Sequence, residues 1–137
     1  MTLVVDASVV VAALTDKTYV GSWAEQMMGS EPLAAPEHMP AEAANVLRRA
    51  TLAGDLSEDA ATQAHVELLE FPVDLHPYRL VGERVWELRR NVTVYDAWYV
   101  ALAEAIGARL ATLDRRLAAA PGLRCSFALP PASQLPG

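Results

Sequence analysis

The sequence contains a single cysteine, Cys125, and a single lysine, Lys17, among its 137 residues. One cysteine cannot form an internal disulfide, and it excludes a metal site built from several thiolates. Basic residues are scarce as well, because 11 lysines and arginines stand against 17 aspartates and glutamates, for a formal net charge of −6. This balance excludes a general basic surface for nucleic acid, so a nucleic-acid substrate would have to be held by local arginines or by metal ions.

Long apolar runs and targeting signals are also missing. The first apolar run has no basic segment before it and is interrupted at Asp6, so no secretory signal peptide is expected. No apolar stretch is long enough to span a bilayer. A glycine-rich phosphate-binding loop is absent too, which argues against nucleotide binding. We therefore expect a cytoplasmic protein without a membrane partner.

Strand and helix patterns alternate along the whole chain. The length and the hydrophobic content of 53% fit one domain spanning residues 1–137 with a real core. Alternation of this kind predicts an α/β fold with a parallel sheet and helices on both faces. The predicted strands are 3–5, 32–35, 73–75, 108–113 and 123–128. The predicted helices are 9–14 (capped by Ser8), 19–28, 40–52, one beginning at Ser57, 78–90, 94–106 (capped by Thr93 and stopped by Gly107) and 115–119, before an irregular tail over 130–137.

Four acidic residues lie where these predicted elements begin or end. Asp6 and Asp114 follow strands, whereas Glu42 and Asp96 lie in the first turns of helices. In an open parallel sheet, sites form beyond the carboxyl ends of the strands, so the four side chains are expected to converge there. Carboxylates repel one another, and a hard divalent cation such as Mg²⁺, which prefers oxygen ligands, is the usual reason for gathering them.

Each acid also has a purely structural explanation. Asp96 lies three residues after Thr93, as in a capping box, and a negative charge at Glu42 favours the helix dipole. Asp114 can cap the helix after it, and Asp6 can end its strand in an Asx turn. Capping explains each acid singly, but it does not require four of them in this order on one side of one sheet. A shared metal site is therefore the preferred interpretation.

With their neighbours, these acids resemble the PIN-domain nucleases, and more narrowly the VapC-type toxins of toxin–antitoxin pairs. Length, order and spacing agree along essentially the whole chain, although residues 55–90 carry no matching motif. Each segment alone is weakly specific, whereas all of them in order are quite specific. The matching segments are Val5-Asp6-Ala7-Ser8, Pro36 followed by Glu42-Ala43-Ala44-Asn45-Val46-Leu47-Arg48-Arg49, Tyr95 to Ala103, and Leu110 to Leu117.

The resemblance implies a three-layer α/β/α fold and an endoribonuclease dependent on Mg²⁺ or Mn²⁺. The four acids would form its metal site, with the small hydroxyl residues Ser8 and Thr112 beside them. RNA as substrate, a cognate antitoxin protein and a homodimer are implied as well. Some relatives have a further acid just after the position of Asp114, where this chain has Arg115 and Arg116, so the number of metal ions stays open.

Polar residues near the acids are candidates for RNA contacts. Arg49 lies seven residues after Glu42, so the two share a helix face. Directly after the last acid stand Arg115 and Arg116, and Asn45 lies three residues after Glu42. Local ion pairs at the surface, or a structural role in the case of Asn45, are the competing explanations.

Aromatic and histidine residues receive structural interpretations. Trp98 and Tyr99 could stack on bases, but core packing is preferred because they lie in an apolar helix. Trp23, Met27 and Met28 could form an apolar groove for a partner helix, again with core packing as the default. Cys125 is expected in a buried strand. The histidines, which show no metal-ligand spacing and are interpreted as structural or exposed, are His38, His65 and His76.

Other α/β classes fit the sequence less well. Receiver domains use a lysine after a late strand, whereas Lys17 lies near the start. Phosphatases of the haloacid type need an aspartate two residues after the first one, and Ser8 occupies that position. A catalytically silent binding module on the same fold remains the second hypothesis, and replacement of Asp6 would distinguish it from an enzyme.

Overall fold

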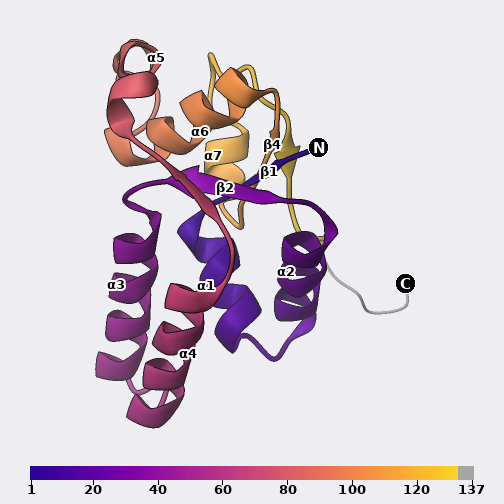
Figure 1. Cartoon of the computed structure of the whole chain (residues 1–137), viewed down its shortest axis with the longest axis vertical. Coiled ribbons are helices and arrows are strands. Elements are labelled where there is room, and N and C mark those ends of the chain that lie inside the picture. Colours follow the sequence, from indigo (N-terminus) through magenta and orange to yellow (C-terminus); the bar gives the residue numbers. More distant parts are fainter. Residues whose placement is uncertain (133–137) are drawn as a thin grey trace.

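A five-stranded sheet forms the centre of the computed structural model, which describes residues 1–132 (Figure 1). The strand order is β3-β2-β1-β4-β5, and every neighbouring pair is parallel, which confirms the predicted fold class. The end of the tail expected to be irregular, residues 133–137, lies outside this description. The strands are β1 (Leu3–Val5), β2 (Leu33–Pro36), β3 (Asp74–His76), β4 (Arg109–Ala111) and β5 (Phe127–Ala128).

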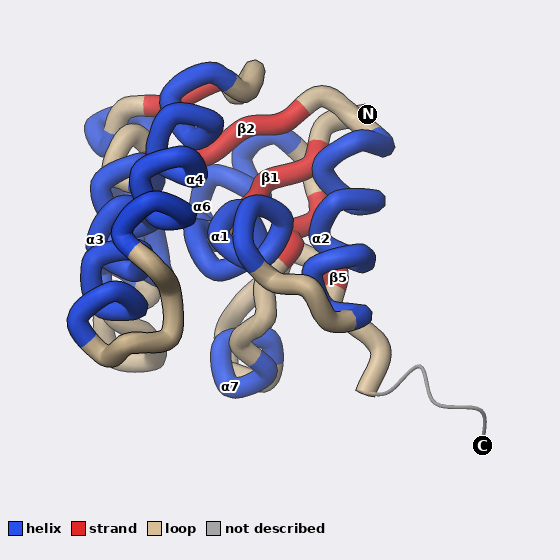
Figure 2. The backbone as a smooth tube through the Cα atoms, turned by 90° about the horizontal axis from the view of Figure 1, so that it is seen from below, coloured by secondary structure: helices blue, strands red, loops and turns tan. Residues whose placement is uncertain are grey.

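Helices cover both faces of the sheet, which gives the three layers that were expected (Figure 1). On one face of the sheet, α1, α2, α3 and α4 pack against one another. On the other face, α6 contacts β1, β2 and β4, and α5 packs against α6. Figure 2, seen from below, shows α1 and α4 in front of the strands. The helices are α1 (Ala7–Thr15), α2 (Tyr19–Ser30), α3 (Met39–Leu52), α4 (Glu58–Glu70), the short 3₁₀ helix η1 (Tyr78–Leu80), α5 (Gly82–Glu87), α6 (Val94–Ile106) and α7 (Arg115–Ala118).

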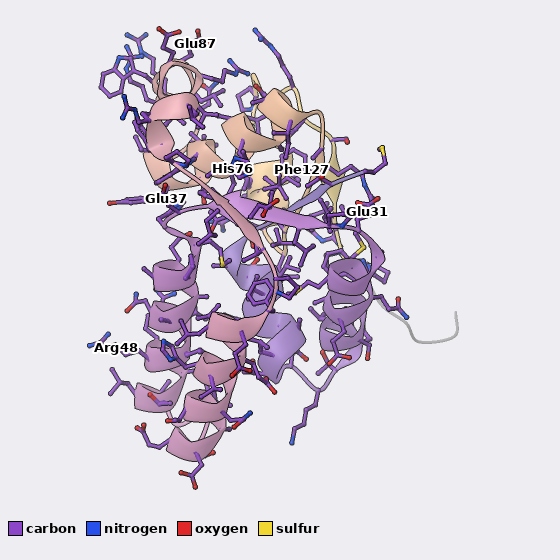
Figure 3. All side chains as sticks on the ribbon, viewed as in Figure 1. Glu31, Glu37, Arg48, His76, Glu87 and Phe127 are labelled. Atoms are coloured by element: carbon purple, nitrogen blue, oxygen red, sulfur yellow. The ribbon has the colours of Figure 1, made fainter. Side chains whose placement is uncertain are left out.

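The register of β1 against β4 brings the ends of these two strands together. Val5 is paired with Ala111, and the backbone amide of Asp6 donates a hydrogen bond to the carbonyl of Ala111 over 3.2 Å. The residues that follow, Asp6 and Thr112, therefore leave the sheet side by side. In Figure 3 this carboxyl edge is the one where Glu37 follows β2, and the opposite edge is marked by Glu31.

The strand and helix that carry two of the acids form the middle of the core. All three side chains of β1 are completely buried, and so are residues 99–103 of α6, each with at most 2% exposed. Burying a Val or Leu side chain contributes roughly 1.5–3 kcal/mol. Asp6 and Asp96 are therefore attached to the elements with the most extensive hydrophobic packing.

Two helix predictions are wrong in detail. The first helix begins at Ala7 and is capped by Asp6, whose side chain accepts from two backbone amides, and not by Ser8. The single helix expected over 78–90 is broken into η1 and α5, because Val81 adopts φ −126° and ψ 6° between them. The apolar spacing persists across this break, which is why the sequence pattern did not reveal it.

The last two strands are shorter than expected. β4 stops at Ala111, because the amides of Leu113 and Asp114 bond to side-chain hydroxyls and no longer to a neighbouring strand. Cys125 is half-buried and precedes β5, so its expected place in a buried strand is wrong. Among residues 1–132, no helix is both long and apolar enough to cross a membrane.

Candidate metal site

The four acids singled out by the sequence line one cavity beyond the carboxyl ends of the strands. Asp6 follows β1 and Asp114 precedes α7, while Glu42 and Asp96 project from the first turns of α3 and α6. The cavity has a volume of about 280 Å³. Its other lining residues are Ala7, Ser8, Asn45, Val46, Arg49 and Tyr99. We call it the acid cavity.

Asp6 is the most enclosed of the four, with 8% of its surface exposed. Its Oδ1 accepts hydrogen bonds from the amide of Ser8 (2.8 Å), the amide of Val9 (3.3 Å) and the hydroxyl of Ser8, and its Oδ2 accepts from the hydroxyl of Thr112. Burial raises the pKa of this carboxyl, although all of these hydrogen bonds act in the opposite direction. The carboxylate is thereby held in one orientation in an environment that a cation would stabilise.

The two hydroxyl groups connect Asp6 to the turn that carries Asp114. Ser8 Oγ accepts a hydrogen bond from the amide of Leu113 over 3.2 Å, and Thr112 Oγ1 accepts one from the amide of Asp114 over 3.0 Å. Each hydroxyl therefore donates to one acid and accepts from the turn leading to another. Thr112 is completely buried. The positions of Asp6 and Asp114 are coupled through these side chains.

Asp114 and Asp96 lie at the capped N-terminal ends of helices and also line the acid cavity. Oδ1 of Asp114 accepts from the amides of Arg116 (2.9 Å) and Leu117 (3.2 Å) at the start of α7. The amide of Asp96 donates to Thr93 Oγ1 over 3.1 Å, so Thr93 caps α6 as predicted. The structural and the metal-binding interpretations are therefore compatible for both acids.

Glu42 is positioned by two aromatic side chains. The hydroxyl of Tyr99 donates to Oε1 of Glu42 over 2.6 Å, and Nε2 of His38 lies 3.0 Å from the same oxygen. The His38 contact lies outside hydrogen-bond geometry, and neither imidazole nitrogen has a hydrogen-bond partner among residues 1–132. Burial raises the pKa of Glu42, but the contacts with His38 and Tyr99 outweigh it and lower the pKa overall.

Repulsion within the cavity is visible at Asp96. Its pKa is raised, first by burial and then by the negative charges of Asp114 and Glu42. In the described part of the chain, no lysine or arginine nitrogen lies within 4.0 Å of a carboxylate oxygen of the four acids. Among residues 1–132, the four carboxylates thus share the cavity without an ion pair to a lysine or arginine, although Arg49 also lines it.

The donor set suits a hard divalent cation, because all four acids offer oxygen ligands. Among residues 1–132, however, no three His, Cys, Asp or Glu side chains are grouped tightly enough to form a preassembled metal site. The fit of a divalent cation to the four acids therefore rests on their oxygen donors, on the cavity that they share and on the repulsion between their charges.

The candidates for RNA contacts lie in three different places. Asn45 and Arg49 line the acid cavity, as their spacing from Glu42 suggested. Arg116 lines an adjoining cavity of about 450 Å³. Arg115 donates to the carbonyl of Pro130 and lines neither cavity.

Sequence reasoning missed the roles of His38 and Tyr99. Tyr99 is buried in the core, as expected, with 1% of its surface exposed, but its hydroxyl reaches Glu42. The ring of His38 stacks on Trp98 with centroids 4.5 Å apart and planes inclined by 17°. Helical spacing could have indicated both contacts. His38 lies four residues before Glu42 and Tyr99 lies three residues after Asp96, so each shares a helix face with one of the acids.

Comparisons with known proteins agree with this fold. Residues 3–123 match the family model described as PIN domain. Ribonuclease VapC1 from Mycobacterium tuberculosis is 43% identical over 129 residues, which cover 92% of this chain and 96% of that protein. The chain therefore belongs to the PIN-domain family, and its resemblance to VapC-type ribonucleases is confirmed.

Solved structures show the same architecture. The structure of PAE2754 from Pyrobaculum aerophilum is 27% identical, with a TM-score of 0.68 over 93% of this chain and 83% of that one. VapBC2 from Rickettsia felis, solved with a DNA fragment from its promoter, gives a TM-score of 0.61 at 15% identity, covering 93% of this chain and 98% of that chain. At that identity the second likeness shows the fold alone.

Proposed function

We propose that this protein is a toxin of the VapC type, an endoribonuclease that depends on Mg²⁺ or Mn²⁺ and hydrolyses phosphodiester bonds of RNA. The observation that carries the proposal is the convergence of four carboxylates in one cavity of a PIN-domain fold, none of them ion-paired with a lysine or arginine among residues 1–132. A relative that is 43% identical over nearly its full length is named as a ribonuclease. The raised pKa of Asp96 supports a cation in the cavity, because a positive charge would remove the repulsion behind part of that rise.

The four acids would divide the work of holding the metal. A bound divalent ion supplies an activated water molecule, neutralises phosphate charge and stabilises the leaving oxygen. Asp6 and Asp96 are proposed as the most direct ligands, and Asp114 and Glu42 complete the site directly or through water. Ser8 and Thr112 fix the orientation of Asp6, as partners behind metal ligands generally do.

Glu42 is suited to orient the attacking water. Its Oε1 is occupied by Tyr99 and His38, whereas Oε2 has no hydrogen-bond partner among residues 1–132. Its lowered pKa keeps the group ionised, which suits it to accept a hydrogen bond from water more than to take up a proton. The carboxylate can therefore accept a hydrogen bond from water on one oxygen while the other is held in place.

A cognate antitoxin is the proposed protein partner. An apolar cavity of about 510 Å³ lies at the amino edge of the sheet, where Leu14, Met28 and Phe71 are among its lining residues. The acids Glu25 and Asp74 line the same cavity, so a partner segment with apolar and basic residues would fit it. The expected groove of Trp23, Met27 and Met28 overlaps it only at Met28, and all three side chains are half-buried against the core. Co-expression with the neighbouring reading frame tests this partner through co-purification and restored growth.

A homodimer is also proposed, on the resemblance to the VapC family. Exposed apolar side chains around η1 and α5 offer a surface for a second copy, among them Leu80 with 69% and Trp86 with 59% of the surface exposed. Light scattering on the purified protein measures the mass directly, and a monomer at micromolar concentration would rule out a stable dimer.

Cleavage of a total-RNA pool tests the proposed activity. The purified protein should produce discrete fragments with Mg²⁺ or Mn²⁺, and none with a chelator or after Asp96→Asn. Asp55→Asn, which changes an exposed aspartate outside the acid cavity, serves as the matched control and should cleave normally. Equal cleavage by the Asp96→Asn protein would refute the proposal, and no cleavage of any RNA would favour the silent binding module.

A further inference from the structure

A second cavity adjoins the acid cavity and contains three arginines. It has a volume of about 450 Å³ and lies between the loop from α5 to α6 and the helix α7. Its lining residues are Arg89, Arg90, Asn91, Val92, Thr93, Asp96, Asp114, Arg116, Leu117 and Ala120. We call it the arginine groove.

The two cavities meet at the metal-site acids. Asp96 and Asp114 line both of them, and among residues 1–132 the two cavities share no other residue. The acid cavity extends from these acids towards Arg49 on α3, whereas the arginine groove extends towards α7 and the α5–α6 loop. A chain of phosphates crossing the acids would therefore meet arginine at both ends.

Positive charge in this groove is concentrated and available. The protein has a net charge of −6, yet three of its arginines line this one groove. No carboxylate oxygen lies within 4.0 Å of their guanidinium groups among residues 1–132, whereas Arg84 and Arg109 are occupied by ion pairs. Charges that are not already neutralised can pair with an incoming phosphate.

The groove also has fixed walls. Asn91 Nδ2 donates to the carbonyl of Pro121 over 2.9 Å and ties the α5–α6 loop to the segment after α7. Arg89 is oriented by a hydrogen bond of 2.7 Å from Nη1 to the carbonyl of Trp86, and its guanidinium lies 4.5 Å from the centre of that indole ring. Arg90 and Arg116 are exposed and make no side-chain hydrogen bond in the described part of the chain.

We propose that the arginine groove binds the phosphates of the RNA strand on one side of the scissile bond. Its proximity to Asp96 and Asp114 places these phosphates directly beside the one that the metal site would cleave. The contacts are to the backbone, so they contribute affinity and register for any RNA and carry no sequence preference of their own. This inference rests on the proposed ribonuclease function and assigns a substrate-binding surface to it.

Salt-dependent binding of a labelled single-stranded RNA of mixed sequence tests the proposal. All variants carry Asp96→Asn, so that the probe is not consumed, and binding is followed by fluorescence anisotropy from 20 to 200 mM salt. The triple variant Arg89→Gln, Arg90→Gln, Arg116→Gln should bind at least tenfold more weakly at low salt. The slope of log K against log salt should become shallower by about 2, because each lost phosphate contact on a single strand removes about 0.7.

A control with the same change in net charge replaces three exposed arginines outside both cavities. These are Arg48, on α3 well away from the sheet in Figure 3, Arg79 and Arg124, each changed to Gln. This variant should retain the parental slope within about 0.7, the contribution of one contact. If Arg89→Gln disturbs the loop, the double variant Arg90→Gln, Arg116→Gln should still make the slope shallower by about 1.4.

The outcomes separate this inference from the proposed function. Equal slopes and affinities for the groove variant and the control would overturn the groove while leaving ribonuclease activity intact. RNA fragments produced by the Asp96→Asn background would instead contradict the proposed metal site. A weaker, less salt-dependent complex for the groove variant alone supports the inference.

Discussion

The hydroxyl of Tyr99 donates a hydrogen bond of 2.6 Å to Oε1 of Glu42, joining α6 to α3 across 57 positions of sequence. Burial and the neighbouring Glu42 raise the pKa of Tyr99, so it remains a donor at any physiological pH. One oxygen of Glu42 is thus fixed from the core, and the other is left to the cavity. The packing of α6 in the core therefore helps to determine where the carboxylate of Glu42, a proposed metal ligand, lies.

Removal of this hydroxyl should impair catalysis more than stability. We expect Tyr99→Phe to lower kcat by about tenfold, because loss of a partner behind a metal ligand typically costs 10- to 100-fold. The free energy of unfolding should fall by only about 1 kcal/mol, since the side chain of Glu42 remains 36% exposed and can bond to water. Tyr95→Phe, at a tyrosine that is 63% exposed, is the control and should change neither quantity. Parental kcat in Tyr99→Phe would show that Glu42 does not need this partner.

Thr112→Val should destabilise the protein by about 1–3 kcal/mol, because it removes a donor to buried Asp6 and an acceptor for the amide of Asp114. Urea denaturation of the metal-free protein measures this change. Thr51→Val is a matched control, since the Thr51 hydroxyl bonds only to a carbonyl within α3, and it should cost less than about 0.5 kcal/mol. Thr112→Ser should retain most of the stability. Equal losses for the two valine variants would exclude a special role of Thr112.

Asp96 should make metal-free stability depend on pH. Its pKa is raised above the ordinary value of 3.8, so the folded protein binds this proton more tightly than the unfolded chain does. Its contribution to stability is therefore complete below pH 3.8 and is lost as the pH rises through the raised pKa. We expect the stability of Asp96→Asn relative to the parent to increase over that window, as followed by denaturation at several pH values in chelator. A pH-independent difference would contradict the repulsion.

Divalent metal should raise the melting temperature by mass action on the folded state. Metal at about 100 times its Kd would add roughly 2.7 kcal/mol to the free energy of unfolding. This increase should shrink at acidic pH, because protons compete with the metal at Asp6 and Asp96, whose pKa values are raised. Differential scanning fluorimetry with Mg²⁺, Mn²⁺ and chelator measures it. An unchanged melting temperature at millimolar metal would contradict binding to the folded state.

The sequence predicted much of the fold because its local signals agree with the tertiary structure. Thr93 caps α6 and Gly107 ends it with φ 67°, a left-handed conformation that glycine adopts without strain. The convergence of four acids followed from the rule that parallel strands end at one edge. The prediction failed between 78 and 90, because the apolar spacing continues through a change of backbone conformation at Val81.

Other parts of the site depend on contacts that no local pattern encodes. Periodicity placed Tyr99 in the core, but it could not show that the hydroxyl would meet Glu42 from another helix. Likewise, Arg115 and Arg116 are adjacent in sequence yet point to different partners, one to Pro130 and the other to the groove. Both outcomes depend on segments that are far apart in the chain, on α6 and α3 in the first case and on the turn after β4 and Pro130 in the second.

Direct measurement of Mn²⁺ binding tests the shared metal site most sharply. Electron paramagnetic resonance reports free Mn²⁺ during a titration and gives the number and affinity of sites for the parent, Asp96→Asn, Asp114→Asn and the control Asp55→Asn. We expect at least one site in the parent and the control, with affinity at least tenfold lower in each of the two acid-cavity variants. The same binding curve for all four proteins, or none for any, would contradict a metal site built from these acids.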